Sequence, residues 1–194
     1  MDIRPFATEQ YFARYEFITP HILCASDCET LTTGELLRLA GLDAADLLGQ
    51  RLSYTESQGD PALRAAVAAL YEDVPPEAVV LLGAPEEGIY LTLRALLEPG
   101  DHVVALTPAY DSLLNLAEHI SGNVSHWPVR PVPGGWALDP AELERLIQPD
   151  TRLVIVNFPH NPTGYLPPPD VFAALIAIVR RRGAWLLCDE MYRG

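Results

Sequence analysis

Polar residues follow several apolar runs of this sequence, where a folded chain could present them to a ligand. Asp189 comes directly after the run at residues 185–188, so its carboxylate could pair with a cationic ring nitrogen. Tyr110 stands two residues after Pro108, where an aromatic ring could stack on a flat ligand. The NPTG segment at residues 161–164 follows a third run. These positions define a candidate ligand-binding edge.

Each of these positions also has a purely structural explanation. Acidic residues are mostly exposed, so Asp189 could simply be solvated in a loop. Asparagine, proline and glycine are turn residues, which suits residues 161–164 as an ordinary turn. An aromatic residue at a helix start, such as Tyr110, is more often plain packing. The turn at residues 83–86 precedes a predicted helix whose N–H groups could hold an anion, but a generic strand-to-helix turn is the commoner explanation.

Short apolar runs alternate with amphipathic segments from about residue 53 to the last residue. Strands are predicted at residues 78–82, 102–106, 124–129, 152–158 and 184–188. Helices are predicted after Asp60 and at residues 86–97, 110–121, 139–147 and 170–182. Runs such as residues 153–156 lack polar alternation, which is typical of parallel strands covered by helices on both faces. The pattern predicts an α/β fold, a three-layer αβα arrangement with a mostly parallel sheet, in which ligands bind beyond the carboxyl ends of the strands.

The first 50 residues have a different pattern, irregular and rich in aromatic residues, with one short helix predicted around residues 35–40. We therefore expect an N-terminal arm and small-domain fragment over residues 1–50, and a large domain over residues 51–194.

Two helix starts are marked by an aspartate that can cap the helix, followed by a proline that suits the first turn. These starts are Asp60 with Pro61, and Asp139 with Pro140.

The charge balance excludes some classes of partner. Against 26 Asp and Glu the chain has 13 basic residues, all arginine, so the formal net charge is −13 and lysine is absent. This charge repels phosphate backbones and anionic bilayers, so we expect no nucleic-acid and no membrane partner. The three cysteines form no CxxC motif, and no metal site is expected. The first residues do not resemble a signal peptide and no apolar run approaches roughly 18 residues, so a cytoplasmic protein is expected.

Four motifs, in order, resemble the class I/II aminotransferases, which are fold-type-I enzymes dependent on pyridoxal 5′-phosphate (PLP). They are Tyr54 with Gly59 and LR at residues 63–64, EPGD with PAY at residues 98–101 and 108–110, NFPHNPTG at residues 157–164, and DEMY at residues 189–192. The match runs from about residue 50 to the last residue. It implies PLP as cofactor, an amino acid and a 2-oxo acid as substrates, and a homodimer.

The resemblance also implies roles for individual residues. Asp189 would pair with the pyridine nitrogen of PLP and keep it protonated. Asn161 and Tyr192 would hydrogen-bond the phenolic oxygen, and Tyr110 would stack on the ring. Tyr54 would reach the cofactor phosphate of the neighbouring subunit, and the turn that cradles the phosphate would consist of Ala84, Pro85 and Glu86. That turn departs from the family pattern, because proline has no N–H and Glu86 and Glu87 bring negative charge near a phosphate.

The resemblance further implies a Schiff-base lysine on a segment some tens of residues beyond the aspartate motif. Because the chain has no lysine, no catalytic residue is assigned, and we expect an N-terminal portion of the enzyme that is inactive alone. Two alternatives stay open: another fold-type-I reaction, such as a carbon–sulfur lyase or decarboxylase, and a non-catalytic PLP-binding or dimerising remnant. A nucleotide-binding domain is disfavoured, because GAPEEG at residues 83–88 does not match GxGxxG.

Overall fold

The computed structural model describes residues 3–193 and divides the chain into two compact units. One unit combines the N-terminal segment up to Phe17 with the chain from Gly83 onward, and the other is Ile18–Leu82. The two units are described separately below. The domain division at residue 50 stays a prediction.

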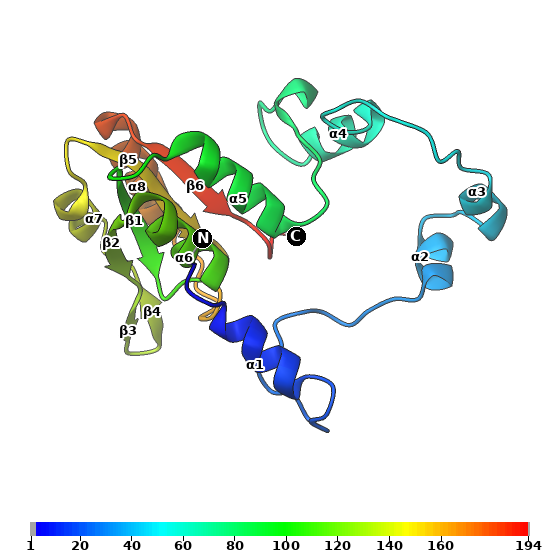
Figure 1. Ribbon diagram of the computed structural model, residues 1–194, viewed down its shortest axis with the longest axis horizontal. Helices are drawn as coiled ribbons and strands as arrows, with labels where there is room; N and C mark the ends of the chain where they lie inside the picture. Colours follow the sequence, from blue (N-terminus) through cyan, green and yellow to red (C-terminus); the bar gives the residue numbers. More distant parts are fainter. Residues whose placement is uncertain (1–2, 194) are drawn as a thin grey trace. The chain divides into compact units, whose positions relative to one another are not determined.

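A four-stranded parallel sheet forms the centre of the first unit (Figure 1). Its strands are β1 (His102–Thr107), β2 (Asn123–Pro128), β5 (Thr151–Asn157) and β6 (Trp185–Asp189). Their order in the sheet is β2-β1-β5-β6, and every neighbouring pair is parallel. The predicted parallel sheet is therefore confirmed, with four predicted strands placed to within about two residues, the error expected at element boundaries.

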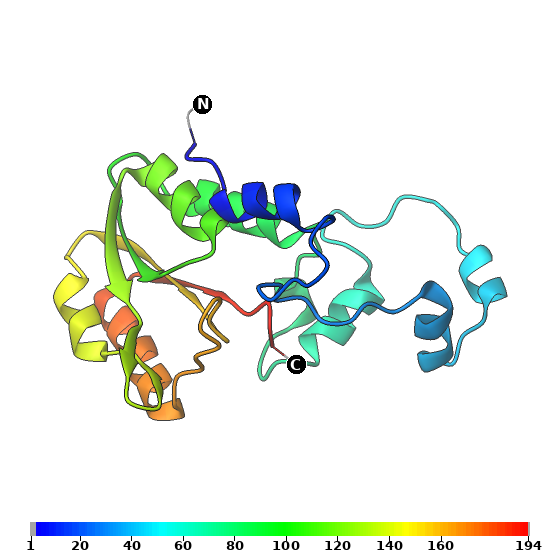
Figure 2. The same cartoon turned by 90° about the horizontal axis from the view of Figure 1, so that it is seen from below.

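Helices cover both faces of this sheet. One face packs against α5 (Pro85–Leu96) and α6 (Asp111–Ser121), and the other against α7 (Pro140–Leu146) and α8 (Pro169–Arg182). Figure 2 shows the layers, with α5 and α6 in green on one side and α7 and α8 in yellow and orange on the other. Successive strand side chains point to opposite faces, so Val104 packs with α7 and α8 and Val103 with α5 and α6. The three-layer prediction is confirmed.

The predicted strand at residues 78–82 is wrong. Pro76–Ala78 form a 3₁₀ turn, η1, and no residue from 79 to 82 is paired in a strand. The Leu81 N–H instead donates to the Gln58 carbonyl at 2.9 Å. An apolar run becomes a strand only when a neighbouring strand takes its main-chain hydrogen bonds, and the described part of the Ile18–Leu82 unit contains no strand.

The N-terminal region contains more helix than predicted. Besides α2 (Thr33–Leu39), which matches the predicted helix, the structure has α1 (Ala7–Tyr15) and α3 (Ala44–Leu48). Both α2 and α3 begin with reciprocal capping boxes, Thr32 with Glu35 and Asp43 with Asp46. Such boxes explain how two helices of only seven and five residues form without a buried residue.

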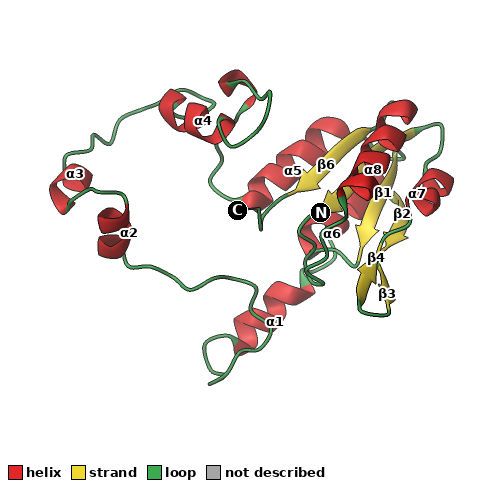
Figure 3. Cartoon of the chain, turned by 180° about the vertical axis from the view of Figure 1, so that it is seen from behind, coloured by secondary structure: helices red, strands yellow, loops and turns green. Residues whose placement is uncertain are grey.

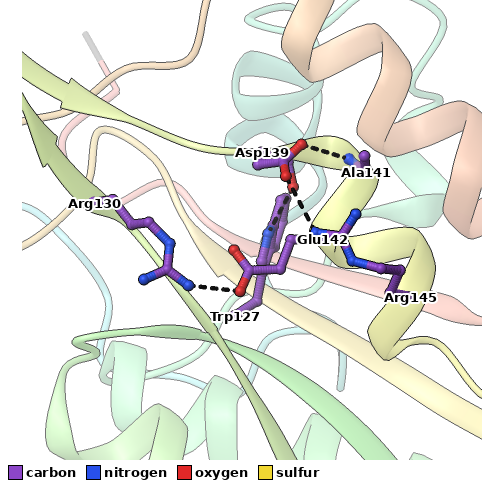
Figure 4. Close-up of polar contacts among 6 residues, drawn as sticks. All are labelled: Trp127, Arg130, Asp139, Ala141, Glu142 and Arg145. Carbon is purple, nitrogen blue, oxygen red and sulfur yellow. Dashed lines mark hydrogen bonds and ion pairs between the residues drawn. The ribbon is translucent and has the colours of Figure 1, made fainter.

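The two predicted aspartate caps are confirmed. The Asp60 carboxylate accepts from the Leu63 N–H at 2.9 Å at the start of α4 (Pro61–Ala68). At the start of α7 the Asp139 carboxylate accepts from the Ala141 N–H at 2.9 Å, and the Asp139 carbonyl accepts from the buried Trp127 indole at 3.0 Å (Figure 4). Asp139 thus begins α7 and also anchors it to β2.

A short antiparallel hairpin, β3 (Arg130–Val132) and β4 (Gly135–Ala137), follows β2 and was not predicted (Figure 3). Gly134 in its turn has φ +86°, a conformation that favours glycine. The Arg130 guanidinium bonds the Glu142 carboxylate of α7 at 2.7 Å, which ties the hairpin to the helix layer (Figure 4).

A buried histidine links three strands of the sheet. The ring of His102, on β1, lies 2.7 Å through Nδ1 from the Thr151 hydroxyl of β5 and 2.9 Å through Nε2 from the Ser125 hydroxyl of β2. The Thr151 hydroxyl also accepts the Gln148 N–H at 2.8 Å, which ties the turn before β5 into the same network. Burial lowers the pKa of His102, which favours the neutral ring that this network needs.

We expect His102→Ala to lower the free energy of unfolding by about 2–4 kcal/mol, because it leaves a cavity and removes the ring partner of two hydroxyls. The pKa of His102 is lower in the folded state than in the unfolded chain. Its stabilising effect is therefore complete above about pH 6.5 and is lost as the pH falls through the folded-state pKa.

Urea unfolding at pH 8 and pH 5 tests both points, with the exposed His21→Ala as the matched control. His102→Ala should reduce the difference in stability between the two pH values, and His21→Ala should not. An unchanged difference in His102→Ala would exclude this linkage.

Candidate functional site

The carboxyl ends of β5 and β6 lie side by side at one edge of the sheet. Asn157 pairs in register with Asp189, the last residue of β6. The Asn157 side-chain amide donates to the Asp189 carbonyl at 3.1 Å, and the Phe158 N–H donates to the same carbonyl at 2.9 Å. The position of Asp189 is therefore set by β5.

Asn157 also sets the position of the following turn. Its side-chain oxygen accepts the Asn161 N–H at 2.6 Å, and the Asn161 side-chain amide in turn donates to the Tyr192 hydroxyl at 3.3 Å. The structure thus brings together two residues that the family resemblance assigned to the same cofactor oxygen. Sequence reasoning gave Asn157 no role. The available signal was a polar residue directly after the apolar run at residues 153–156.

The Asp189 carboxylate lies in an environment that disfavours its charge. Burial raises its pKa, the nearby Glu86 carboxylate raises the pKa further, and a hydrogen bond from the Met191 N–H, at 3.0 Å, opposes both effects. A cation beside Asp189 would relieve the repulsion from Glu86 and stabilise the ionised form. This site is therefore suited to a protonated nitrogen of a ligand.

Tyr110 is half-buried and is held by a residue far away in the sequence. Its hydroxyl donates to the Glu9 carboxylate of α1 at 2.5 Å. Burial raises the pKa of the Tyr110 phenol, and the carboxylates of Glu9 and Glu86 raise it further, so the phenol stays protonated at neutral pH. Glu9 was missed by sequence reasoning, since no local pattern relates residues 101 positions apart.

His160 connects the loop that carries Tyr110 with the turn that carries Asn161. Its Nε2–H donates to the Pro108 carbonyl at 2.8 Å, and its Nδ1 lies 2.7 Å from the Thr163 hydroxyl. His160 is only 2% exposed, and burial lowers its pKa despite the opposing bond to Pro108. A neutral ring with one donor and one acceptor nitrogen satisfies both partners.

The turn before α5 shows how its two glutamates are used. Ala84 is the N-cap without a side-chain hydrogen bond, and Pro85 occupies the first turn. The Glu87 carboxylate reaches back to accept the Gly83 N–H at 2.9 Å, whereas the charge of Glu86 acts on Asp189 and Tyr110. An anion at this turn would therefore compete with one carboxylate and be repelled by another.

Comparison with known proteins identifies the family. The family model for class I and II aminotransferases matches residues 22–194. The chain belongs to this aminotransferase family. The cofactor of the family is PLP, and the matched region includes every residue of the candidate site described above except Glu9.

Two curated relatives match most of this chain, whereas the chain matches less than half of each relative. Capreomycidine synthase of Streptomyces vinaceus is 40% identical over 176 residues, which is 88% of this chain and 44% of that protein. A probable aspartate/prephenate aminotransferase of Thermus aquaticus is 31% identical over 165 residues, 82% of this chain and 42% of that protein. The chain therefore spans less than half the length of these relatives.

A solved structure confirms the fold of the family. A PLP-dependent aminotransferase from Streptococcus suis 89-1591 superposes with a TM-score of 0.92 at 31% identity, covering all of this chain and 52% of that one. The three-layer α/β arrangement is thus the aminotransferase fold, represented here by part of its length.

The strand-edge residues fit the ring of PLP. The Asp189 carboxylate suits the ring nitrogen, and the linked Asn161 and Tyr192 side chains suit the ring oxygen. The turn at Gly83 fits the phosphate less well, because Glu87 already accepts the Gly83 N–H. The pattern of fit therefore favours the aromatic end of the cofactor over its anionic end.

The remaining sequence predictions that concern binding are those for Tyr54, for a metal site and for a membrane span. Tyr54 belongs to the Ile18–Leu82 unit and is fully exposed, and its role toward a neighbouring subunit stays a prediction. Between residues 3 and 193, no three His, Cys, Asp or Glu side chains are grouped to hold a metal ion, and no helix has the length and apolar character to cross a membrane.

We expect Asn157→Ala to lower the free energy of unfolding by about 1–3 kcal/mol, because the partly buried Asn161 N–H and Asp189 carbonyl each lose a hydrogen-bond partner. Urea unfolding would measure the loss. The control is Asn123→Ala, which removes a similar amide from an exposed position on β2. Equal losses of stability in the two variants would show that the two hydrogen bonds of the Asn157 side chain, to Asp189 and to Asn161, do not stabilise the fold more than an exposed amide does.

Proposed function

We propose that this chain forms the ring-binding part of a PLP-dependent aminotransferase, which moves an amino group from an amino acid to a 2-oxo acid. The observation that carries the proposal is the position of Asp189 at the end of β6, on the same sheet edge as the linked Asn161 and Tyr192. Membership of the aminotransferase family supports the same conclusion.

Each of these residues has a defined task in the proposed reaction. PLP, when bound, supplies a ring that accepts the electrons released when a bond to the substrate α-carbon breaks. Asp189 holds a proton on the ring nitrogen, which makes the ring a better electron acceptor. Asn161 and Tyr192 orient the ring oxygen, and Tyr110 provides the aromatic face on which the ring stacks.

The proposal includes an assembly and a location. Tyr54 contacts the phosphate of a neighbouring subunit, so the complete enzyme is a homodimer. The net charge of −13 supports small-molecule substrates over nucleic acid or membrane partners. The cytoplasm is the proposed location.

A second candidate is a different reaction that uses the same cofactor. The 40% identical relative is named a synthase, not an aminotransferase. Asp189, Asn161 and Tyr110 bind the cofactor in either case and do not determine which bond of the substrate breaks. Comparing the products formed from amino acids by the complete enzyme would separate the two candidates.

We expect Asp189→Asn to weaken PLP binding about tenfold, because the amide cannot stabilise a protonated ring nitrogen. Equilibrium dialysis of PLP would measure this. The PLP analogue in which carbon replaces the ring nitrogen should bind equally well to the wild type and to Asp189→Asn. The control variant Asp170→Asn changes an exposed aspartate and should bind PLP like the wild type. Equal weakening for PLP and the carbon analogue would remove Asp189 from this role.

We propose that the 194-residue chain alone is inactive. Covalent attachment of PLP needs a primary amine, and in a chain without lysine only the α-amino group of Met1, which lies outside the described residues, supplies one.

After incubation with PLP and borohydride, peptide mapping by mass spectrometry should show no adduct on any side chain, as in a sample without PLP. A stoichiometric adduct on a residue other than Met1, or amino-acid-dependent turnover by the chain alone, would contradict this proposal.

A further inference from the structure

One face of α6 receives the N-terminal segment. Asp111, Asn115 and Glu118 lie three or four residues apart and so share a face of the helix. The Asp111 carboxylate accepts the Thr8 N–H at 2.8 Å. The remaining contacts involve Arg4, whose carbonyl accepts from Asn115 at 3.3 Å and whose guanidinium lies 3.0 Å from the Glu118 carboxylate. The segment before α1 therefore lies along α6 in space (Figure 1).

Helix α1 depends on these contacts. It has nine residues, none of them buried, and its N-cap residue Phe6 makes no side-chain hydrogen bond. Helices of this length are marginal when isolated. Asp111 supplies the missing acceptor at the helix start, and the Phe6 side chain packs against the apolar cluster formed with α5 and α6. The helix is thus held in place by α6.

The docked helix brings Glu9 to Tyr110. Tyr110 is the N-cap of α6, so its main chain is fixed by the helix, and its hydroxyl is fixed by the 2.5 Å bond to the Glu9 carboxylate. A tyrosine ring is placed by two torsions, χ1 and χ2. Holding the main chain and the hydroxyl fixes χ1, and χ2 is restricted because a phenol O–H lies in the plane of its ring and here points to Glu9. The acceptor is a carboxylate, and hydrogen bonds to a charged acceptor are stronger than those between neutral groups, so Glu9 holds the Tyr110 hydroxyl firmly.

We propose that Glu9 is a positioning residue of the cofactor site, which orients the Tyr110 ring for stacking on PLP. The inference rests on the proposed function, in which Tyr110 supplies the stacking face. Because coupling between two binding events is reciprocal, PLP binding should in turn strengthen the docking of α1 on α6.

The first test compares PLP affinity among variants of the 194-residue chain by equilibrium dialysis. Glu9→Ala should raise the dissociation constant about fivefold, a modest effect because Glu9 acts on the cofactor only through Tyr110, and Glu9→Gln should restore part of the affinity. Tyr110→Phe should have a similar effect, and the double variant should be no weaker than Tyr110→Phe alone. Arg4→Ala is the matched control, because it removes an exposed contact of the same segment and leaves Glu9 and Tyr110 in place.

The second test needs no cofactor. With 3-fluorotyrosine at position 110, the fluorine NMR signal should shift or broaden in Glu9→Ala and stay unchanged in Arg4→Ala. This measurement reports the orientation of the Tyr110 ring independently of the proposed function.

The outcomes separate the two proposals. An unchanged fluorine signal in Glu9→Ala overturns the inference. So does wild-type PLP affinity in Glu9→Ala, or additive losses from Glu9→Ala and Tyr110→Phe. If the wild-type chain binds no PLP while the fluorine signal changes, the proposed function and the role of Glu9 at the cofactor both fail, and only the orientation of Tyr110 by Glu9 is supported.

Discussion

Asn157 and Asp189 are paired at the carboxyl ends of two parallel strands, and this pair brings Asn161 and Tyr192 together at the same edge of the sheet. The Asn157 side chain bonds the main chain of β6 and also the main chain of the following turn. Parallel pairing therefore aligns Asp189, and the same side chain brings Asn161 within reach of Tyr192. The helices on both faces make this possible, because a parallel sheet is stable only when both faces are covered.

The electrostatics of the site are one-sided. Glu86 acts on both Asp189 and Tyr110, raising the pKa of each, and Glu9 adds a second carboxylate beside Tyr110. A ligand with a cationic ring nitrogen reduces this repulsion, whereas an anionic group at the Gly83 turn increases it. These charges therefore favour the ring of PLP over its phosphate as the part that the proposed site would bind.

The sequence predicted those elements whose cause is local. The apolar runs that became β1 and β5 and the aspartate caps at Asp60 and Asp139 all follow from short-range physics. The run at residues 78–82 failed because strand formation needs a partner, and the hairpin at β3 and β4 was missed. Of the site, Asp189, Tyr110 and the turn that contains Asn161 were singled out by their positions after apolar runs, and the family resemblance added Tyr192 and the expected role of each residue. The bond of Glu9 to Tyr110 and the two hydrogen bonds of the Asn157 side chain could not be predicted, because they join residues that only folding brings together.

The two outer strands of the sheet differ in how they are protected. On the β2 side, the strand ends at Pro128 and continues into the hairpin, which limits further pairing. On the β6 side, Trp185 is 55% exposed, the strand has no proline, and no strand among residues 3–193 pairs with its outer edge. Another strand can add to such an edge. Whether this protein stays dispersed or aggregates in solution therefore depends on whether the outer edge of β6 is free to pair.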